Sequence, residues 1–264
     1  MSPVSASPTP LVCITGASSG IGQALALAYA QAGWRLALVV RKEKETKSWL
    51  DAHQISPDSY QIYTADVADV DATVAAGEAI CRRQGLPDVV VANAGISIGM
   101  DTRHRRDLDV MTRTLMTNNV GMAATFHPFV AAMVARGAGT LVGVASVAAI
   151  RGMPGHGAYC ASKAAVVSYC ESLRAELHGT GVRVVTLLPG YVDTPLTRHN
   201  PYPMPFLMAP EAFAQRALRA IARGDAYRII PWPMAVVAAV LRVWPRAGFD
   251  RFFSRRPRKP RQTD

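Results

Sequence analysis

The chain has 264 residues, of which 50% are apolar and 18% are charged. This balance excludes an intrinsically disordered protein, which combines low hydrophobicity with high charge, and the length suffices for one large α/β domain. The formal net charge of +10 is uneven, because eight Arg and Lys stand against two Asp from Leu241 onward. Nothing in the rest of the chain has the pattern of a nucleic-acid-binding module, so we expect no nucleic-acid partner.

Residues 1–10 are rich in Ser and Pro and contain no apolar run of signal-peptide length. We therefore expect a disordered N-terminal arm on a cytoplasmic protein. The four cysteines are scattered without a CxxC pair, which favours structural thiols in a reducing compartment. We expect no metal site.

Apolar segments alternate with helical ones along the chain, and the apolar runs have the near-continuous hydrophobicity of strands buried on both faces. Strands are predicted at residues 11–15, 35–40, 61–65, 89–92, 140–145, 182–188 and 227–230. Helical segments are predicted at residues 23–31, 108–136, 159–178 and 210–223. This alternation predicts an α/β fold with a Rossmann-type, doubly wound, seven-stranded parallel sheet in a single domain over residues 11–231.

The turn after the first strand has glycines in a Gly-x3-Gly-x-Gly pattern. Such a turn lets the backbone approach a pyrophosphate, and it directs the free N–H groups of the following helix toward the anion. An ordinary tight turn would also use glycines, but the position between strand and helix favours a dinucleotide site. The residues expected to bind the cofactor here are Gly16, Ser18, Ser19, Gly20, Ile21 and Gly22.

The end of the second strand indicates which nicotinamide cofactor would bind. An acidic residue there accepts hydrogen bonds from a ribose 2′-hydroxyl, whereas a basic one favours a 2′-phosphate. Arg41 and Lys42 stand there without an acid, so NADP(H) is favoured over NAD(H), with Arg41 at the phosphate. Alternatively, both cations belong to the solvated charged stretch that follows. Asp66 and Val67, after the third strand, are expected at the adenine, although Asp66 would also suit a helix N-cap.

Tyr159 and Lys163 lie four residues apart at the start of a helical segment and so share one face. A nearby ammonium stabilises a phenolate and lowers the tyrosine pKa from about 10, which makes the pair a tuned acid and base. Tyr-x3-Lys alone arises often by chance. Ser146, however, stands at the end of the fifth predicted strand, where ligands bind in an open α/β sheet, and its hydroxyl could hold a substrate oxygen.

These residues belong to a longer series that resembles the short-chain dehydrogenase/reductase family from Thr15 to about Ile230. In order and at the spacing of the family, the motifs are together very specific. They are Thr15-Gly16-Ala17-Ser18-Ser19-Gly20-Ile21-Gly22, Asp66-Val67, Asn93-Ala94-Gly95, Asn118-x-x-Gly121, Ser146, Tyr159-x3-Lys163 and Pro189-Gly190. The resemblance implies an oxidoreductase that forms a homodimer or homotetramer through the helices containing Asn118 and Tyr159.

The resemblance also implies a role for each matching residue. Tyr159 would pass the proton, Ser146 would orient the substrate oxygen, and Lys163 would lower the tyrosine pKa and bind the nicotinamide ribose. Asn118 would help to hold a proton-relay water. Besides Tyr159 and Lys163, the cofactor pocket would include Asn93, Gly95, Pro189, Gly190 and Thr194.

Two positions depart from the family pattern. Ala92 stands where a second asparagine is usual, and Asn119 follows Asn118 where an apolar residue is common. The spacing to Gly121 favours Asn118 as the catalytic asparagine, and Asn119 is the alternative.

Two other functions remain in competition. A nucleotide sensor or scaffold would bind NADP(H) without chemistry, but it would have no chemical reason to retain Ser146, Tyr159, Lys163 and Asn118 together. An epimerase or dehydratase would share Tyr-x3-Lys but usually has another glycine spacing and a larger C-terminal region. We therefore favour an NADP(H)-dependent oxidoreductase acting on a carbonyl or a secondary alcohol.

The substrate would be chosen by loops at residues 96–100, 153–156 and 191–208. The loops contain Met153, Met204, Phe206, Leu207 and Met208, which indicate an apolar substrate unless they face the core. His156 is expected to be an exposed loop histidine, and Cys160 and Cys170 are expected to be structural.

Residues 232–264 differ in character from the rest of the chain. The apolar segment 234–241 predicts a helix too short to span a bilayer. It would cap the substrate cleft or pack on another subunit; the alternative is a peripheral helix at a membrane surface, aided by the basic tail. The tail itself is expected to be solvated and partly disordered, with an anionic surface as its alternative partner.

Overall fold

The computed structural model describes residues 9–198 and 200–261. Seven parallel strands form one sheet in the order β3-β2-β1-β4-β5-β6-β7, which confirms the doubly wound sheet predicted from the sequence. The strands are β1 (Leu11–Thr15), β2 (Arg35–Val40), β3 (Tyr60–Thr64), β4 (Val89–Ala92), β5 (Gly139–Val144), β6 (Val182–Pro189) and β7 (Tyr227–Ile230). Residues 1–8 of the expected N-terminal arm lie outside the described residues.

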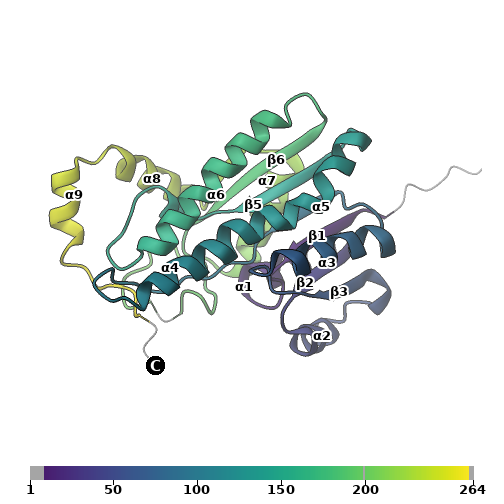
Figure 1. Ribbon diagram of the computed structural model, residues 1–264, viewed down its shortest axis with the longest axis horizontal. Helices are drawn as coiled ribbons and strands as arrows, with labels where there is room; N and C mark the ends of the chain where they lie inside the picture. Colours follow the sequence, from purple (N-terminus) through teal and green to yellow (C-terminus); the bar gives the residue numbers. More distant parts are fainter. Residues whose placement is uncertain (1–8, 199, 262–264) are drawn as a thin grey trace, which may run out of the picture.

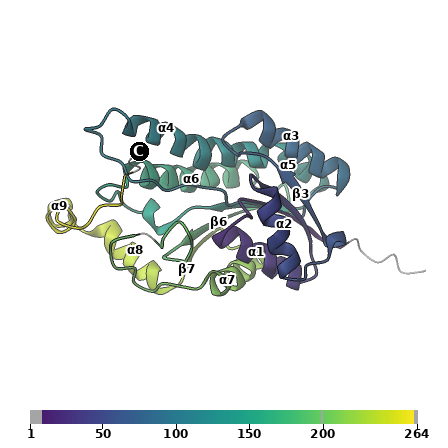
Figure 2. The same ribbon diagram turned by 90° about the horizontal axis from the view of Figure 1, so that it is seen from below.

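Helices cover both faces of the sheet. Figure 2 shows α4, α5 and α6 on one side and α1 and α7 on the other, and Figure 1 looks onto the first of these sides. The helices are α1 (Gly20–Gln31), α2 (Glu43–Ala52), α3 (Val70–Arg83), α4 (Asp107–Leu115), α5 (Gly121–Arg136), α6 (Gly157–Glu176), α7 (Pro210–Arg223), α8 (Pro233–Val243) and α9 (Arg246–Phe253).

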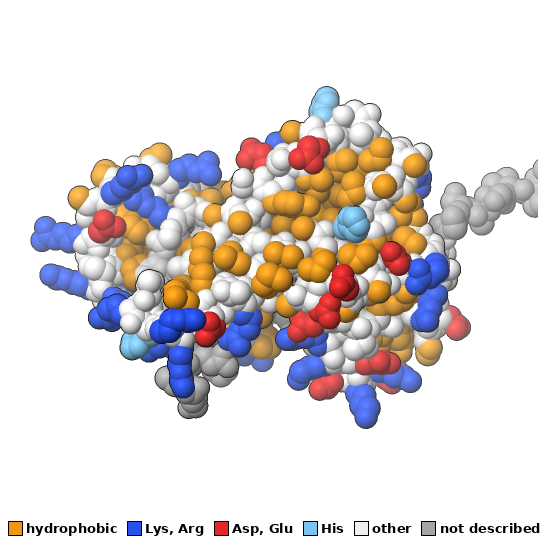
Figure 3. All heavy atoms as spheres, in the orientation of Figure 1, with side chains coloured by type: hydrophobic (Ala, Val, Ile, Leu, Met, Phe, Trp, Pro, Cys, Tyr) orange, Lys and Arg blue, Asp and Glu red, His pale blue; other side chains and the backbone are white. Residues whose placement is uncertain are grey.

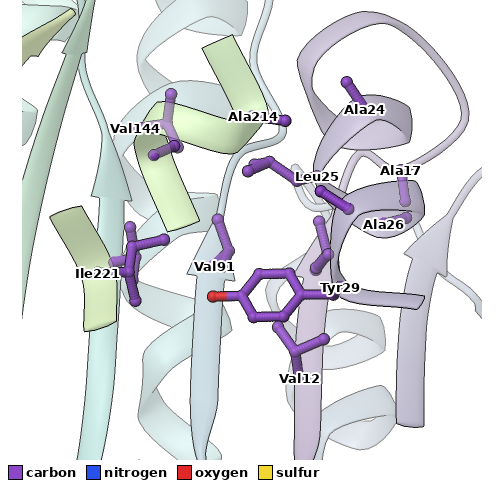
Figure 4. Packing of buried hydrophobic residues seen from close by; sticks show 14 of the residues in the cluster. Val12, Ala17, Ala24, Leu25, Ala26, Tyr29, Val91, Val144, Ala214 and Ile221 are labelled. Atoms are coloured by element: carbon purple, nitrogen blue, oxygen red, sulfur yellow. The ribbon is translucent and has the colours of Figure 1, made fainter. Parts of the chain in front are cut away.

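A separate hydrophobic core lies on each face of the sheet. Successive side chains of a strand point to opposite faces, so Leu38 of β2 packs in the core with α1 and α7, while Val39 packs in the core with α5. Figure 4 shows the Tyr29 ring of α1 beside Val12 and Val91 of the two central strands. The inner strands β1, β2 and β4 are therefore almost wholly apolar because both of their faces are buried, whereas the edge strands β3 and β7 are partly exposed and contain polar residues.

The single helical stretch predicted at residues 108–136 is divided in the structure. A π-helical segment, Met116–Val120, separates α4 from α5. At the start of α5, a Cβ on Gly121 would come within 2.4 Å of the Val67 carbonyl oxygen, so glycine permits this close approach. An apolar pattern of helical period does not reveal one wider turn, and π-turns occur frequently at functional sites.

The C-terminal segment contains two helices, of which only the first was expected. One face of α8 packs on the end of β6, where a Cβ on Gly190 would come within 2.8 Å of Met234. After α9 the chain returns to the body of the protein, and the Gly99 N–H donates a hydrogen bond to the Pro260 carbonyl at 3.2 Å. We call residues 258–261 the C-terminal strap.

The expectation of a solvated tail is wrong for the C-terminal strap. Arg261 makes two hydrogen bonds to the carboxylate of Asp107, at 2.6 and 3.0 Å, and Arg258 lies 3.5 Å from the Asp101 carboxylate. These acids lie more than a hundred residues earlier in the chain, and only the fold brings the opposite charges together.

Candidate active site

The carboxyl ends of the central strands place most of the candidate residues at one edge of the sheet. The strand order reverses between β1 and β4, which opens the crevice where ligands bind in such folds. Gly16 follows β1, Asn93 follows β4 and Ser146 follows β5, while Tyr159 and Lys163 come from the first turns of α6.

The glycine turn has the geometry of a backbone cradle. Gly16 and Gly20 have φ values of +71° and +55°, which favour glycine. A Cβ on Gly16 would lie 2.8 Å from Ala94 Cα, and one on Gly22 would lie 2.2 Å from the Gly16 carbonyl oxygen. The tight packing leaves the turn no room for side chains at these positions.

The N-terminus of α1 is free to bind an anion. Its N-cap, Ser19, makes no side-chain capping bond, and the first turn contains no acidic residue. A cavity of about 220 Å³ lies beside Ser19 and Gly20 and extends to Asp193 and Arg198. The free N–H groups and the positive end of the helix dipole fit the pyrophosphate of a dinucleotide.

Asn93 fixes the glycine turn to the neighbouring strand. Its side-chain amide donates hydrogen bonds to the carbonyls of Thr15 at 3.1 Å and Gly16 at 3.4 Å. The Thr15 hydroxyl accepts hydrogen bonds from the backbone N–H groups of Asn93 and Ala94 at 3.1 and 3.2 Å. Asn93 therefore holds the backbone of the glycine turn against the end of β4.

Arg41 and Asp66 lie side by side at the ends of β2 and β3. The Arg41 guanidinium is 3.3 Å from the Asp66 carboxylate, and both side chains are largely exposed. The N-cap of α3 is Asp69, which accepts a hydrogen bond from the Ala72 N–H, so the N-cap alternative for Asp66 is wrong. The next residue, Val67, lies with its carbonyl against the start of α5 at Gly121.

Ser146, Tyr159 and Lys163 converge as the sequence predicted. A hydrogen bond joins Ser146 to Tyr159, and the Ser146 hydroxyl also accepts the Ala148 N–H at 3.1 Å. The Lys163 ammonium lies 5.8 Å from the centre of the Tyr159 ring and donates to the Val144 carbonyl at 2.8 Å. The lysine is 5% exposed, so its charge lies in a nearly dry environment behind the tyrosine.

Burial dominates the acidity of both groups. Part of the Tyr159 side chain reaches solvent, but loss of water around the group raises its pKa to about 12, while the hydrogen bond from Ser146 acts in the opposite direction. The net direction is opposite to the lowering expected from Lys163. Desolvation lowers the pKa of Lys163 to about 8, which leaves the ammonium mostly protonated at neutral pH.

The two adjacent asparagines have different partners. The Asn118 carbonyl oxygen accepts the Ile96 N–H at 2.8 Å, and its amide donates to the Ile96 carbonyl at 3.0 Å and to the Ser162 hydroxyl at 2.9 Å. Asn119 donates only to the Ser162 carbonyl, at 2.9 Å, and its own side-chain oxygen is buried without a partner among the described residues. Of the two asparagines, only Asn118 therefore joins the loop after Gly95 to α6.

The other cofactor candidates lie close to the glycine turn or to α8. Thr194 is 7% exposed, and a Cβ on Gly20 would come within 3.0 Å of its methyl group. Pro189 ends β6, and the Gly190 N–H donates to the Ile230 carbonyl at 2.8 Å. A Cβ on Gly95 would lie 3.2 Å from the Asn118 side-chain oxygen and 3.4 Å from Lys163 Nζ, so glycine keeps this space open.

The loops that were expected to determine the substrate expose some of their apolar side chains to solvent and pack others against the core. Phe206 and Leu207 are 51% and 48% exposed, and Met208 packs against the core. His156 is not an exposed histidine as expected: its ring lies 5.6 Å from that of Tyr202, which in turn lies 6.5 Å from the ring of Tyr191. Desolvation and the charge of Lys259 lower the pKa of His156 to about 4, so this side chain is neutral at neutral pH.

The C-terminal strap adds residues that the sequence analysis missed. The Lys259 ammonium donates to the Ser97 hydroxyl at 2.9 Å and to the Leu196 carbonyl at 3.3 Å. It thereby bridges the loop after Gly95 and the loop after β6. No local sequence signal marks this contact, because a lysine in a run of basic residues is typical of a solvated tail.

Comparison with known proteins shows what this chain is similar to. Residues 10–202 match the family model described as short chain dehydrogenase. An uncharacterized oxidoreductase of Myxococcus xanthus is 40% identical over 90% of this chain and 93% of its own.

Two crystal structures share the fold. A short chain dehydrogenase from Burkholderia cenocepacia in complex with NADP has a TM-score of 0.79 at 24% identity, over 94% of this chain and 98% of that one. A short chain dehydrogenase/reductase from Burkholderia phymatum in complex with NAD has a TM-score of 0.79 at 23% identity, over 97% of this chain and 98% of that one.

Proposed function

Since this chain belongs to the short-chain dehydrogenase family and is an oxidoreductase of that family, we propose that it transfers a hydride between NADP(H) and a carbonyl or secondary alcohol. The observation that carries the proposal is the hydrogen-bonded pair of Ser146 and Tyr159 with the buried Lys163 ammonium behind it. The three groups stand at the edge of the sheet where the glycine turn offers a cradle for a dinucleotide.

When bound, the nicotinamide ring would supply or accept the hydride. The residues of the chain supply the proton and the positioning. The Tyr159 hydroxyl, kept neutral by its high pKa, donates its proton to the substrate oxygen during carbonyl reduction. Ser146 holds the same oxygen by a hydrogen bond, and the Lys163 charge stabilises the phenolate that forms. In the alcohol direction, the same phenolate accepts the proton.

The preference for NADP(H) rests on the charge at the end of β2. Arg41 has a largely exposed guanidinium there, and Asp66 holds it from the neighbouring strand end at 3.3 Å. A guanidinium is a strong partner for phosphate oxygens, and no acidic residue at the end of β2 competes for a ribose hydroxyl. Gly16, Ser18, Ser19, Gly20, Ile21 and Gly22 would hold the pyrophosphate, and Asp66, Val67, Asn93, Gly95, Pro189, Gly190 and Thr194 would line the rest of the cofactor site.

An apolar substrate fits the side chains around Tyr159. The ring of Tyr202 lies near those of Tyr191 and the neutral His156, and Tyr202 is close enough to Tyr159 for the two groups to interact electrostatically. Aromatic rings of this kind give a substrate with an aromatic or aliphatic group beside its carbonyl apolar surface to pack on.

The face formed by α3, α5 and α6 supports a homo-oligomer. Figure 3 shows hydrophobic side chains gathered across it, and Val70, Val120 and Tyr169 are between 38% and 39% exposed. A shallow cavity of about 850 Å³ between these helices would receive side chains of a second copy. Light scattering should give a dimer or tetramer, and Tyr169→Glu should shift the protein toward the monomer.

The test of the proposed reaction is oxidation of NADPH, with NADH in parallel, against aldehydes, ketones and longer apolar carbonyl compounds. Turnover should prefer NADPH and should be lost in Tyr159→Phe, whereas Tyr169→Phe, on the same helix but far from the site, should retain it. Tight NADPH binding without turnover on any compound would instead support the nucleotide-sensor alternative.

A further inference from the structure

One exposed surface of the molecule is unusually apolar and takes no part in the proposed reaction. It consists of α8 and α9 with the residues around them, 232–256, and we call it the hairpin surface. Four side chains at helical spacing along α8 are exposed by 52–79%: Trp232, Val236, Val240 and Val243. They form a stripe along one side of the helix.

The opposite side of α8 packs against the protein, so the exposed stripe is a second apolar face and not the face that anchors the helix. Met234 and Ala238 are 3% and 5% exposed and face the body of the protein. The helix is thus already anchored through one face, and its second apolar face is left without a partner among the described residues. Such a helix, apolar nearly all round, is normally covered on both sides.

The following helix extends the apolar surface. Phe249 is buried under Arg151, whose guanidinium lies 4.2 Å from the centre of its ring. Phe252 is 44% exposed and lies 5.4 Å from the ring of Trp244. Trp232 and Trp244 of this surface both reach solvent, and tryptophan is enriched at membrane–water interfaces because its ring is apolar and its N–H is polar.

The cations of the C-terminal segment divide into two groups. Arg258, Lys259 and Arg261 contact the body of the protein through the C-terminal strap. The second group belongs to the hairpin surface. Among the described residues, no acidic side chain lies within ion-pair distance of any arginine of this group, and Asp250 is the one acidic residue of the hairpin surface. The group comprises Arg242, Arg246, Arg251, Arg255 and Arg256. Figure 3 shows Lys and Arg side chains projecting around the end of the molecule where Figure 1 places α9, with hydrophobic side chains among them.

We propose that the hairpin surface docks on an anionic phospholipid bilayer, with α8 and α9 lying in the plane of the interface. Apolar side chains would enter the acyl boundary while the arginines contact lipid phosphates. Among the described residues no helix has the length and apolarity needed to cross a membrane, and α8 has 11 residues. The surface would therefore lie on the bilayer rather than span it.

A second copy of the chain fits this surface less well. In a two-fold dimer the same patch faces itself, so the five arginines of one subunit would meet the five of the other. A surface of lipid phosphates has the complementary charge. Docking rests on the hairpin surface alone and does not depend on the proposed reaction.

The experiment is flotation of the full-length protein with vesicles of phosphatidylcholine, with and without phosphatidylglycerol. We expect binding to the anionic vesicles that weakens with added salt, and little binding to neutral ones. Arg246→Glu/Arg251→Glu should lower the partition coefficient by more than about tenfold, because each cation contributes measurably near an anionic surface. The control, Arg216→Glu/Arg219→Glu on α7, makes the same change in net charge and should bind nearly as wild type.

The apolar contribution has its own test. Val236→Ser/Val240→Ser should weaken binding by about tenfold, whereas Val134→Ser, on the exposed side of α5, should not. The fluorescence of Trp232 should shift to the blue on vesicle binding, and Trp232→Phe should remove most of that shift.

Three results would overturn the proposal. One is that the protein binds neutral and anionic vesicles equally, or binds neither. Another is that the α7 control loses as much vesicle binding as Arg246→Glu/Arg251→Glu. The third is a change of oligomeric state in the Val236→Ser/Val240→Ser variant without vesicles, which would make the surface a subunit interface.

Discussion

Replacement of Asn118 tests whether this residue positions the site or serves only as a chemical relay. Its side chain makes three hydrogen bonds, two to the backbone of Ile96 and one to Ser162, and it is 2% exposed. In Asn118→Ala all three are lost together, and the groups of Ile96 and Ser162 are left without this partner. The loop after Gly95 would then lose this link to α6 and keep the hydrogen bond from the Ala158 N–H to Met100 Sδ.

The expected size of the effect follows from these contacts. At roughly 0.5–1.5 kcal/mol net for each bond, the free energy of unfolding should fall by about 3 kcal/mol. For a domain of this size each kcal/mol shifts the melting temperature by about 2–4 °C, so the variant should melt about 6–12 °C below wild type. Catalytic activity should fall as well, because the loop carries Ser97 and borders Lys163.

Asn119→Ala is the matched control. It removes one hydrogen bond, to the Ser162 carbonyl, and also removes a buried oxygen that has no partner in the described structure. The two effects oppose one another, so the loss of stability should be about 1 kcal/mol or less. Urea unfolding followed by circular dichroism measures both variants. Equal destabilisation by the two replacements, or wild-type stability of Asn118→Ala, would refute the assignment of Asn118 as the positioning residue.

Three further predictions concern the cofactor, the pH dependence and the C-terminal strap. Arg41→Ala should raise the KM for NADPH about tenfold and leave that for NADH nearly unchanged, since a charged hydrogen bond to a phosphate is lost; equal changes for both would remove Arg41 from the phosphate site. Carbonyl reduction should decline as the pH rises through about 8, because Lys163 loses its proton there; a pH–rate profile that stays flat well above that value contradicts this. Arg261→Ala should raise the KM for the carbonyl substrate several-fold with little effect on NADPH, because Lys259 is no longer held between Ser97 and Leu196; the same change from Arg255→Ala would show a general effect of tail charge.

The sheet and the positions of the candidate catalytic residues could be predicted because local patterns determine them. The inner strands are buried on both faces and almost wholly apolar, and β1 and β4 have the bounds that were predicted, as do the edge strand at residues 227–230 and the helix at 210–223. Ser146 and Tyr159 lie at the ends of elements whose directions the parallel order fixes, so their convergence follows from the topology.

The π-helical segment and the C-terminal strap could not be predicted in the same way. A five-residue wider turn leaves no mark in an apolar pattern, although this turn contains both asparagines, of which Asn118 contacts Ile96. The ion pair of Arg261 with Asp107 joins residues far apart in the chain. Basic residues in a tail look alike in sequence, whether they are solvated, paired with the body or exposed beside an apolar helix.

The pKa of Tyr159 is a similar case. Its spacing to Lys163 suggests a lowered value, but the structure shows that loss of water around the phenol is the larger effect. Burial is a property of the folded environment, which the Tyr-x3-Lys motif does not contain.

The central claim is that a hydride moves between the nicotinamide and a carbon whose oxygen is protonated by Tyr159. Its most direct test is incubation of wild type and Tyr159→Phe with NADPH deuterated at C4 and an active carbonyl compound, followed by mass spectrometry of the alcohol. The account predicts deuterium on the carbinol carbon with wild type and none above background with the variant. Alcohol formed by the variant at the wild-type rate, or product without deuterium from either stereoisomer of the labelled cofactor, would contradict it.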